Sequence, residues 1–184
     1  MLDLGTALPP FSLSDLDGKT VTDRDFPNAA ALVVAFICPH CPYVKHVRQA
    51  FAEMATEYRQ RQVAIVAINS NDAQAFPDDD PAGMRREASA AGFTFPYLYD
   101  EAQEVAKAFR AACTPDFFVF DRDRRLAYRG QFDGSRPKSE TPVTGADLRA
   151  ALDAILAGRD PSSAQRPSVG CNIKWKPQNA PSYA

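Results

Sequence analysis

Residues 31–47 of the chain read ALVVAFICPHCPYVKHV. The first seven residues form a continuous apolar run rich in valine and phenylalanine, which is typical of a strand buried on both faces. Two cysteines, Cys38 and Cys41, follow directly. Beyond them apolar side chains recur every three or four residues, opposite a charged face, which predicts an amphipathic helix: Val44, Val47, Phe51, Met54 and Tyr58. The stretch therefore places a Cys-x-x-Cys pair between a buried strand and a helix.

This position predicts redox chemistry for the pair. The free N–H groups and the positive dipole end of a helix N-terminus favour a thiolate, so we expect Cys38 to be the exposed, attacking sulfur. Pro39 suits the first helical position, where a missing N–H costs nothing. Cys41, one turn further on, is expected to resolve the mixed disulfide. A protonated His40 would stabilise the Cys38 thiolate and thereby make the pair more oxidising.

The rest of the chain alternates strands and helices. Strands are predicted at 63–68, 95–99 and 117–120 with a hairpin partner at 126–132, helices at 81–91, 101–111 and 145–157, and an N-terminal hairpin at 9–21. This order requires a central sheet covered on both faces, parallel at first and antiparallel in the closing hairpin. The expected class is a three-layer α/β architecture. Asp80 and Thr144 are the expected helix N-caps, and Gly92 the expected helix end.

Length and composition indicate one globular domain. The chain has 184 residues, of which 45% are hydrophobic and 24% charged. We expect a domain over 1–159 and an irregular, proline-containing tail over 160–184 that packs on it. A net charge of -2 gives no reason to expect nucleic acid or a membrane as partner. The start of the chain resembles no signal peptide, so a cytoplasmic location is predicted.

A structural or metal-binding pair is the main alternative. Four-coordinate zinc usually takes two such pairs, and the chain has one. His40 and His46 both lie beside the cysteines, but His46 is expected to point away from Cys38. The sequence therefore predicts no metal and no other cofactor. A metal-delivery protein and a redox-silent interaction module stay open as alternatives.

Residues 8–159 resemble the thioredoxin superfamily, and more narrowly its redoxin branch with the AhpC/TSA-type proteins. The resemblance is carried by Cys38-Pro39-His40-Cys41 and by CTPDFFVF at 113–120, while GCNIKWK at 170–176 is similar to a group of bacterial thioredoxin-family proteins. It implies a thioredoxin-like three-layer sandwich with a mixed central sheet and an N-terminal β-hairpin. It also implies a thiol–disulfide oxidoreductase that acts on a disulfide-containing protein or small molecule and uses an unidentified thiol electron donor.

The same resemblance assigns roles to residues outside the pair. Pro115 would be a cis-proline facing the cysteines, and Thr114 would offer its backbone to an extended substrate. Without the resemblance, a proline before a strand is usually only a turn. Cys113 and Cys171 are candidate auxiliary redox thiols. Cys113 is alternatively a small buried hydrophobe, and the tail with Trp175 a cover over an apolar patch.

Two features depart from the related families. Thioredoxins carry a buried carboxylate on the strand before the motif, and 32–35 contains none. Lys45, His40 or water would then move protons. Peroxiredoxins carry Thr or Ser three residues before the reactive cysteine and Pro seven before it, where this chain has Ala35 and Ala31. A thiol peroxidase is therefore a less favoured alternative. The acidic run 78–80 is expected to be a solvated loop without a chemical role.

Overall fold

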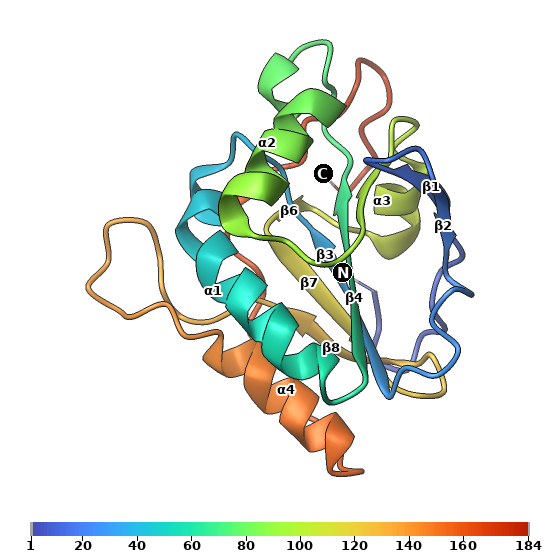
Figure 1. Cartoon of the computed structure of the whole chain (residues 1–184), viewed down its shortest axis with the longest axis vertical. Helices are drawn as coiled ribbons and strands as arrows, with labels where there is room; N and C mark the ends of the chain where they lie inside the picture. Colours follow the sequence, from blue (N-terminus) through green and yellow to red (C-terminus); the bar gives the residue numbers. More distant parts are fainter. Residues whose placement is uncertain (1, 184) are drawn as a thin grey trace.

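The computed structural model describes residues 2–183, which form a seven-stranded mixed sheet between helices (Figure 1). The strand order is β2-β1-β5-β4-β3-β7-β8. The strands of this sheet are β1 (Ser12–Asp15), β2 (Thr20–Thr22), β3 (Ala31–Phe36), β4 (Val63–Asn69), β5 (Tyr97–Tyr99), β7 (Asp116–Phe120) and β8 (Leu126–Gly130). The helices are α1 (Pro42–Arg59), the 3-10 turn η1 (Pro77–Asp79), α2 (Pro81–Ala91), α3 (Glu104–Phe109) and α4 (Ala146–Leu156). A separate ladder pairs β6 (Cys113–Thr114) with β9 (Cys171–Asn172).

The pairing of the central strands determines where the site lies. β3 runs parallel to β4 and antiparallel to β7, with Phe36 opposite Asp116. The carboxyl ends of β3 and β4 therefore meet the amino end of β7 at one edge of the sheet. The cysteine motif, the loop after Asn69 and the Thr114–Pro115 segment all lie at this end of the central strands.

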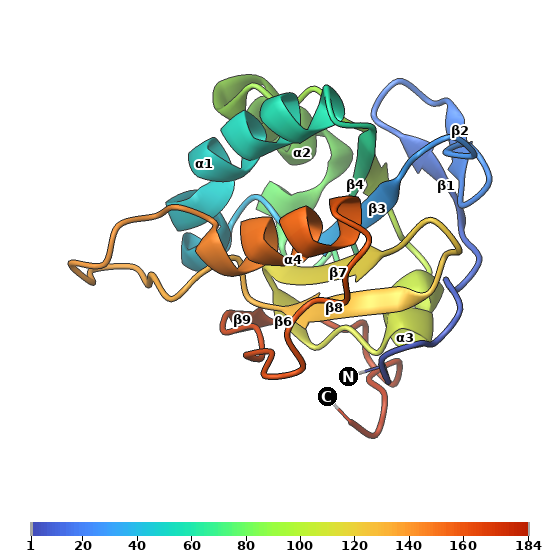
Figure 2. The same cartoon turned by 90° about the horizontal axis from the view of Figure 1, so that it is seen from below.

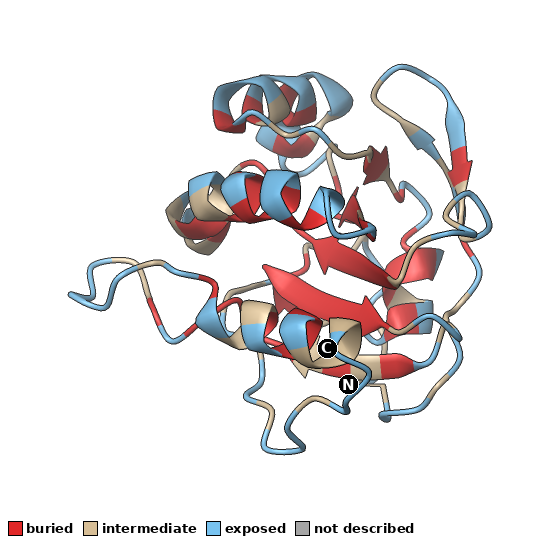
Figure 3. Cartoon of the chain, turned by 60° about the horizontal axis from the view of Figure 1, so that its bottom comes forward, coloured by how far each residue is buried: buried red, intermediate tan, exposed pale blue. Residues whose placement is uncertain are grey.

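The two faces of the sheet carry separate apolar cores. One core packs α1, α2 and α4 on one face, and the other packs α3 and the tail residues Ile173 and Trp175 on the opposite face (Figure 2). Aromatic pairs occur in both, with ring centroids 5.3 Å apart for Phe51 and Phe117. Figure 3 shows the buried central strands between partly exposed helices. The predicted three-layer α/β architecture is confirmed.

The helix after the motif begins later than predicted. Pro42, not Pro39, is its first residue, and Cys41 is the N-cap with φ −64° and ψ 123°. The reason is local, because a residue that precedes a proline is kept out of the helical region. Cys41 therefore lies at the helix N-terminus, and Cys38 lies in the irregular segment between β3 and α1.

Other boundaries differ in smaller ways. Gly145 with φ 68°, not Thr144, is the N-cap of α4. The amides of both residues bind the Asp133 carboxylate at 2.7 Å, which fixes the turn without a threonine cap. α2 has its predicted ends, with the Asp80 carboxylate accepting from the Gly83 amide at 2.6 Å. α3 is shorter than predicted, since only 104–109 are helical.

The tail is not wholly irregular, because it forms β9. Its strand is short, which explains why the sequence shows no alternation there. Within residues 2–183, the structure contains no helix that is both long and apolar enough to cross a lipid bilayer.

Candidate active site

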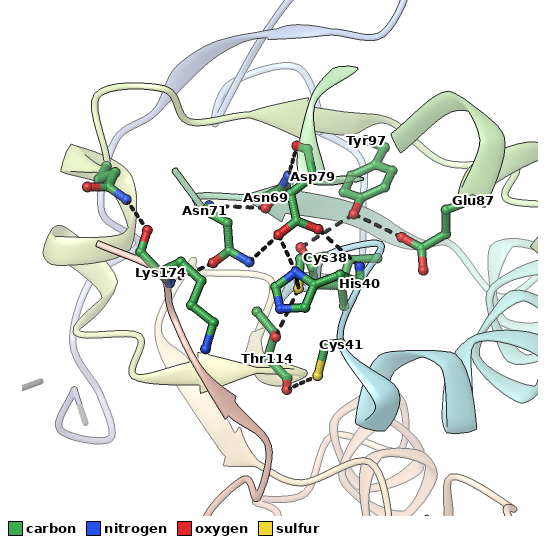
Figure 4. A network of polar contacts seen from close by, with 12 residues as sticks. Cys38, His40, Cys41, Asn69, Asn71, Asp79, Glu87, Tyr97, Thr114 and Lys174 are labelled. Carbon is green, nitrogen blue, oxygen red and sulfur yellow. Dashed lines mark hydrogen bonds and ion pairs between the residues drawn. The ribbon is translucent and has the colours of Figure 1, made fainter. Parts of the chain in front are cut away.

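Both cysteine sulfurs face Thr114, the residue before Pro115 (Figure 4). The Cys38 Sγ lies 3.3 Å from the Thr114 hydroxyl, and the Cys41 thiol donates to the Thr114 carbonyl at 3.1 Å. The Thr114–Pro115 peptide bond is cis. The structure therefore brings together four residues that the sequence singled out. The predicted exposure of Cys38 is wrong, because both cysteines are fully buried and Thr114 contacts both sulfurs.

The Cys38 side of the pair is built around a buried carboxylate. The His40 amide donates to Asp79 Oδ1 at 3.0 Å, and the His40 Nδ1 contacts Asp79 Oδ2. The same Nδ1 lies 3.9 Å from the Cys38 Sγ. The Phe76 ring stacks on His40 with centroids 5.5 Å apart. A hydrogen bond to Cys41, burial and the Asp79 charge together raise the pKa of the Cys38 thiol well above its ordinary value.

Asp79 is the functional residue that the sequence interpretation missed. It ends η1 and is fully buried, whereas its neighbour Asp78 is exposed. Asn69 donates to the Asp79 carbonyl at 2.7 Å, and Asn71 donates to the Asp79 carboxylate at 2.8 Å. The expectation of a solvated acidic loop is therefore wrong for Asp79. Two asparagines at the end of a buried strand were the signal, because such amides need partners.

The Cys41 side is built around the start of α1. A hydrogen bond with Cys38, contact with Thr114 and the Val44 amide lower the pKa of Cys41, against the effect of burial. The helix dipole acts in the same direction. The pKa of Cys41 is therefore lowered while that of Cys38 is raised, and ionisation of Cys41 would give up its bond to the Thr114 carbonyl. The sequence placed the helix N-terminus at Cys38, whereas α1 starts at Pro42 with Cys41 as its N-cap. The role of Cys38 as the attacking sulfur stays a prediction.

A second buried carboxylate lies beneath the motif. The Tyr97 hydroxyl donates to Glu87 Oε2 at 3.1 Å and lies 3.4 Å from the carbonyl of Ile37, which precedes Cys38. Burial raises the pKa of Glu87 to about 7, although Arg48 lies 3.9 Å away. β3 carries no carboxylate, as the sequence shows. The site nevertheless has two, which other elements supply.

The other two cysteines differ in their surroundings. The Cys113 thiol points to the Pro115 carbonyl at 3.8 Å, and burial raises its pKa. Cys171 pairs with Thr114 across the β6–β9 ladder and is partly exposed. Burial and a hydrogen bond to Cys41 raise the pKa of Cys171 to about 11. All four cysteines are free thiols. A redox role for Cys113 stays a prediction.

A metal could use three of these side chains. Cys38, His40 and Asp79 offer donor atoms within 4.8 Å of one another. Structural zinc takes four ligands. The histidine nitrogen is already in contact with the Asp79 carboxylate, so a metal would have to displace that contact. His46 contributes nothing here, since its Nε2 contacts the Ser135 hydroxyl at 3.1 Å. The donor set therefore fits hydrogen bonding better than a closed metal site.

Residues 4–129, which include the cysteine pair and the cis-proline, match the model of the AhpC/TSA family. The chain belongs to the AhpC/TSA family. This family member is also similar to the thiol-disulfide oxidoreductase ResA of Bacillus thuringiensis subsp. konkukian. The two are 21% identical over 125 residues, which cover 68% of each chain.

Two solved structures show how far the similarity of this AhpC/TSA family member extends. A hypothetical protein of Sinorhizobium meliloti 1021 is 52% identical, with a TM-score of 0.94 and 96% of each chain covered. A thiol:disulfide interchange protein of the thioredoxin family from Chlorobium tepidum TLS is 18% identical. Its TM-score is 0.62, and 86% of this chain and 98% of that chain are covered. The predicted superfamily and thioredoxin-like fold are confirmed, and the predicted thiol–disulfide oxidoreductase activity agrees with these relatives.

Proposed function

We propose that this protein catalyses dithiol–disulfide exchange with Cys38 and Cys41 as its redox pair. The convergence of both sulfurs on Thr114, beside a cis-proline, carries the proposal. In the reduced state the first thiolate forms on Cys41, at the N-terminus of α1. A disulfide between the two cysteines closes when a partner disulfide is reduced to two thiols.

The surrounding carboxylates support this chemistry because exchange moves protons as well as electrons. Closing the disulfide releases the proton that Cys38 holds in the reduced state. His40 Nδ1 links the Asp79 carboxylate to the Cys38 sulfur. Glu87 lies beneath the motif and accepts a hydrogen bond from the Tyr97 hydroxyl. A carboxyl group with a pKa of about 7 can exchange protons near neutral pH. The proposed proton route therefore keeps His40, which contacts Asp79, and uses the two acids in place of Lys45 or water.

The proposed partners are disulfide-containing proteins or small molecules, with a thiol compound as electron donor. The rim of the site offers them an apolar surface. Phe76, stacked on His40, is 37% exposed, and Pro42 at the helix start is exposed. The backbone edge of β6, which the family resemblance assigns to an extended substrate, is paired with β9. A partner therefore enters over the Phe76 rim or displaces the tail.

The test is reduction of insulin disulfides by the purified protein with dithiothreitol as donor. We expect Cys38→Ser and Cys41→Ser each to lower the rate to that of dithiothreitol alone. Cys113→Ser, which removes a thiol outside the pair, separates a third redox thiol from a structural one. Equal rates for the wild type and both active-site variants would contradict the proposal.

We propose a cytoplasmic location, which fractionation of cells producing the full-length protein would test by its separation from periplasmic markers.

Peroxide is not the proposed substrate, because Ala35 and Ala31 replace the residues that the peroxide pocket of related enzymes uses. Hydrogen peroxide consumption above the uncatalysed rate, dependent on Cys38, would favour the peroxidase alternative instead.

A further inference from the structure

The tail is attached to the active site by an ordered set of bonds. Cys171 lies opposite Thr114 in the β6–β9 ladder, and the Ile173 amide donates to the Ala112 carbonyl at 3.1 Å. The Lys174 amide then donates to the Asn71 side chain at 2.8 Å. Because Asn71 also donates to Asp79, one side chain links the tail to the acid beside Cys38.

Gly170 shows how closely the tail approaches the pair. A Cβ on this residue would lie 2.0 Å from the Thr114 carbonyl oxygen. The glycine backbone therefore lies directly on the carbonyl that the Cys41 sulfur contacts at 3.1 Å. A residue with a side chain at position 170 would push the tail away from this carbonyl. The next residue is Cys171, which pairs with Thr114 in the β6–β9 ladder and packs against the apolar core that includes Cys41.

We infer that Cys171 is a third redox thiol, which exchanges with the Cys38–Cys41 disulfide by attacking Cys41. This inference rests on the proposed function of the pair. The Cys171 sulfur forms a bond to the Cys41 sulfur, the Cys38–Cys41 bond breaks, and Cys38 leaves as a thiolate. The proton released by Cys171 passes to Cys38. One disulfide replaces another, so the number of electrons does not change.

The arrangement of the sulfurs selects Cys41 as the target. Cys38 faces the Thr114 hydroxyl and His40, whereas Cys41 faces the Thr114 carbonyl on which the tail lies. Cys113, the neighbour of Thr114 along β6, points to the Pro115 carbonyl. After the exchange, Cys38 is again a free thiol, and the tail is covalently bound to the site.

The test is disulfide mapping after oxidation of the full-length protein with oxidised glutathione, followed by acid quenching, alkylation and trypsin digestion. Trypsin leaves Cys38 and Cys41 on one peptide, 25–45, and Cys171 on another, 160–174. In Cys38→Ser, we expect the two peptides to become linked, with two molecules of reduced glutathione formed per disulfide. In Cys41→Ser, we expect them to stay separate.

Gly170→Ala tests the placement of the tail without removing a thiol. In the Cys38→Ser background we expect it to lower the yield of linked peptides about tenfold, because the effective concentration of Cys171 at Cys41 falls. Gly134→Ala is the matched control, since its added Cβ would meet open space, and it should leave the yield unchanged.

The outcomes separate this inference from the proposed function. If wild-type protein forms no Cys38–Cys41 disulfide, the proposed function fails. If that disulfide forms but Cys171 stays fully alkylated in the wild type and in Cys38→Ser, only the third-thiol inference is overturned. Linkage of the peptides in Cys41→Ser would also overturn it, because Cys171 would then react with Cys38. Circular dichroism of each variant shows whether it is folded.

Discussion

The two cysteines of one short motif lie in opposite electrostatic surroundings. On the Cys38 side, the buried Asp79 carboxylate disfavours a thiolate. On the Cys41 side, the start of α1 and the Val44 amide favour one. The hydrogen bond between the two sulfurs is the largest cause of both pKa shifts, and the elements that each sulfur faces act in the same directions. When the pKa of one thiol is raised and that of its partner is lowered, the pair can hold one proton and one negative charge at defined positions.

The largest expected effect on stability comes from deleting the acid on the Cys38 side. Asp79 is buried and accepts from His40 and Asn71, so Asp79→Ala leaves their donors without a partner. We expect the free energy of unfolding to fall by about 3 kcal/mol in urea titrations. The exposed neighbour gives the control, since Asp78→Ala should change it by less than about 0.5 kcal/mol. Equal effects of the two substitutions would show that the hydrogen bonds of the Asp79 carboxylate do not stabilise the fold.

The second prediction concerns Glu87, whose pKa is raised from 4.5 to about 7. Between these values the folded protein keeps a proton that the unfolded chain has released. A rise in pH through this window therefore favours unfolding, and the contribution to stability is lost by pH 7. Glu87→Gln removes this loss, so its free energy of unfolding should gain about 2 kcal/mol relative to the wild type between pH 5 and pH 7.

Urea titrations at several pH values measure this gain. Glu53→Gln is the matched control because Glu53 is an exposed carboxylate on α1, and we expect no comparable gain from it. A constant difference between Glu87→Gln and the wild type across the window would mean that the buried carboxyl is ionised throughout.

The third prediction tests the charge bias directly. In a Cys41→Ser background, Cys38 titrates without its partner but still beside Asp79. Adding Asp79→Asn removes the negative charge that raises the pKa of Cys38. We expect alkylation of Cys38 by iodoacetamide at fixed pH to become about tenfold faster. Adding Asp78→Asn instead should leave the rate unchanged. If Asp79→Asn also leaves the rate unchanged, the Asp79 charge does not raise the pKa of Cys38.

The smallest expected effect is that of Tyr97→Phe. It removes the hydroxyl between Glu87 and the Ile37 carbonyl, so the free energy of unfolding should fall by about 1 kcal/mol. Because the Tyr97 hydrogen bond lowers the pKa of Glu87, the variant should also move the pH-dependent window upwards. Tyr43→Phe, at a partly buried site on α1, controls for loss of a hydroxyl. If the pH range over which stability changes stays the same, the Tyr97 hydroxyl does not influence the pKa of Glu87.

Much of the site was predictable from local patterns. The apolar run, the cysteine pair and the helical periodicity after it predicted the strand–motif–helix unit, and they are the basis of the chemistry proposed for Cys38 and Cys41. The later helix start was also contained in the sequence, since Cys41 precedes Pro42 and a residue before proline avoids the helical region.

The parts that could not be predicted are contacts between distant segments. Asp79 reaches His40 across 39 residues, because β3 and β4 are parallel neighbours and end at the same edge of the sheet. Cys171 reaches Thr114 only because β9 pairs with β6. Residues 160–184 show no periodicity that predicts β9, because a strand of two residues is too short for an alternating pattern. The need for glycine at position 170 is evident only from the structure, where a Cβ would lie 2.0 Å from the Thr114 carbonyl oxygen.

The sequence by itself determined the proposed reacting pair, the class of fold and the helix that follows the motif, because each depends on residues a few positions apart. The tertiary structure decided the environment of each sulfur. Pairing of β3 with β4 brings one acid to Cys38, packing of α2 and β5 brings another beneath it, and the β6–β9 ladder brings a third thiol to Cys41. Such contacts are set by strand pairing and loop closure, which local residue patterns do not encode.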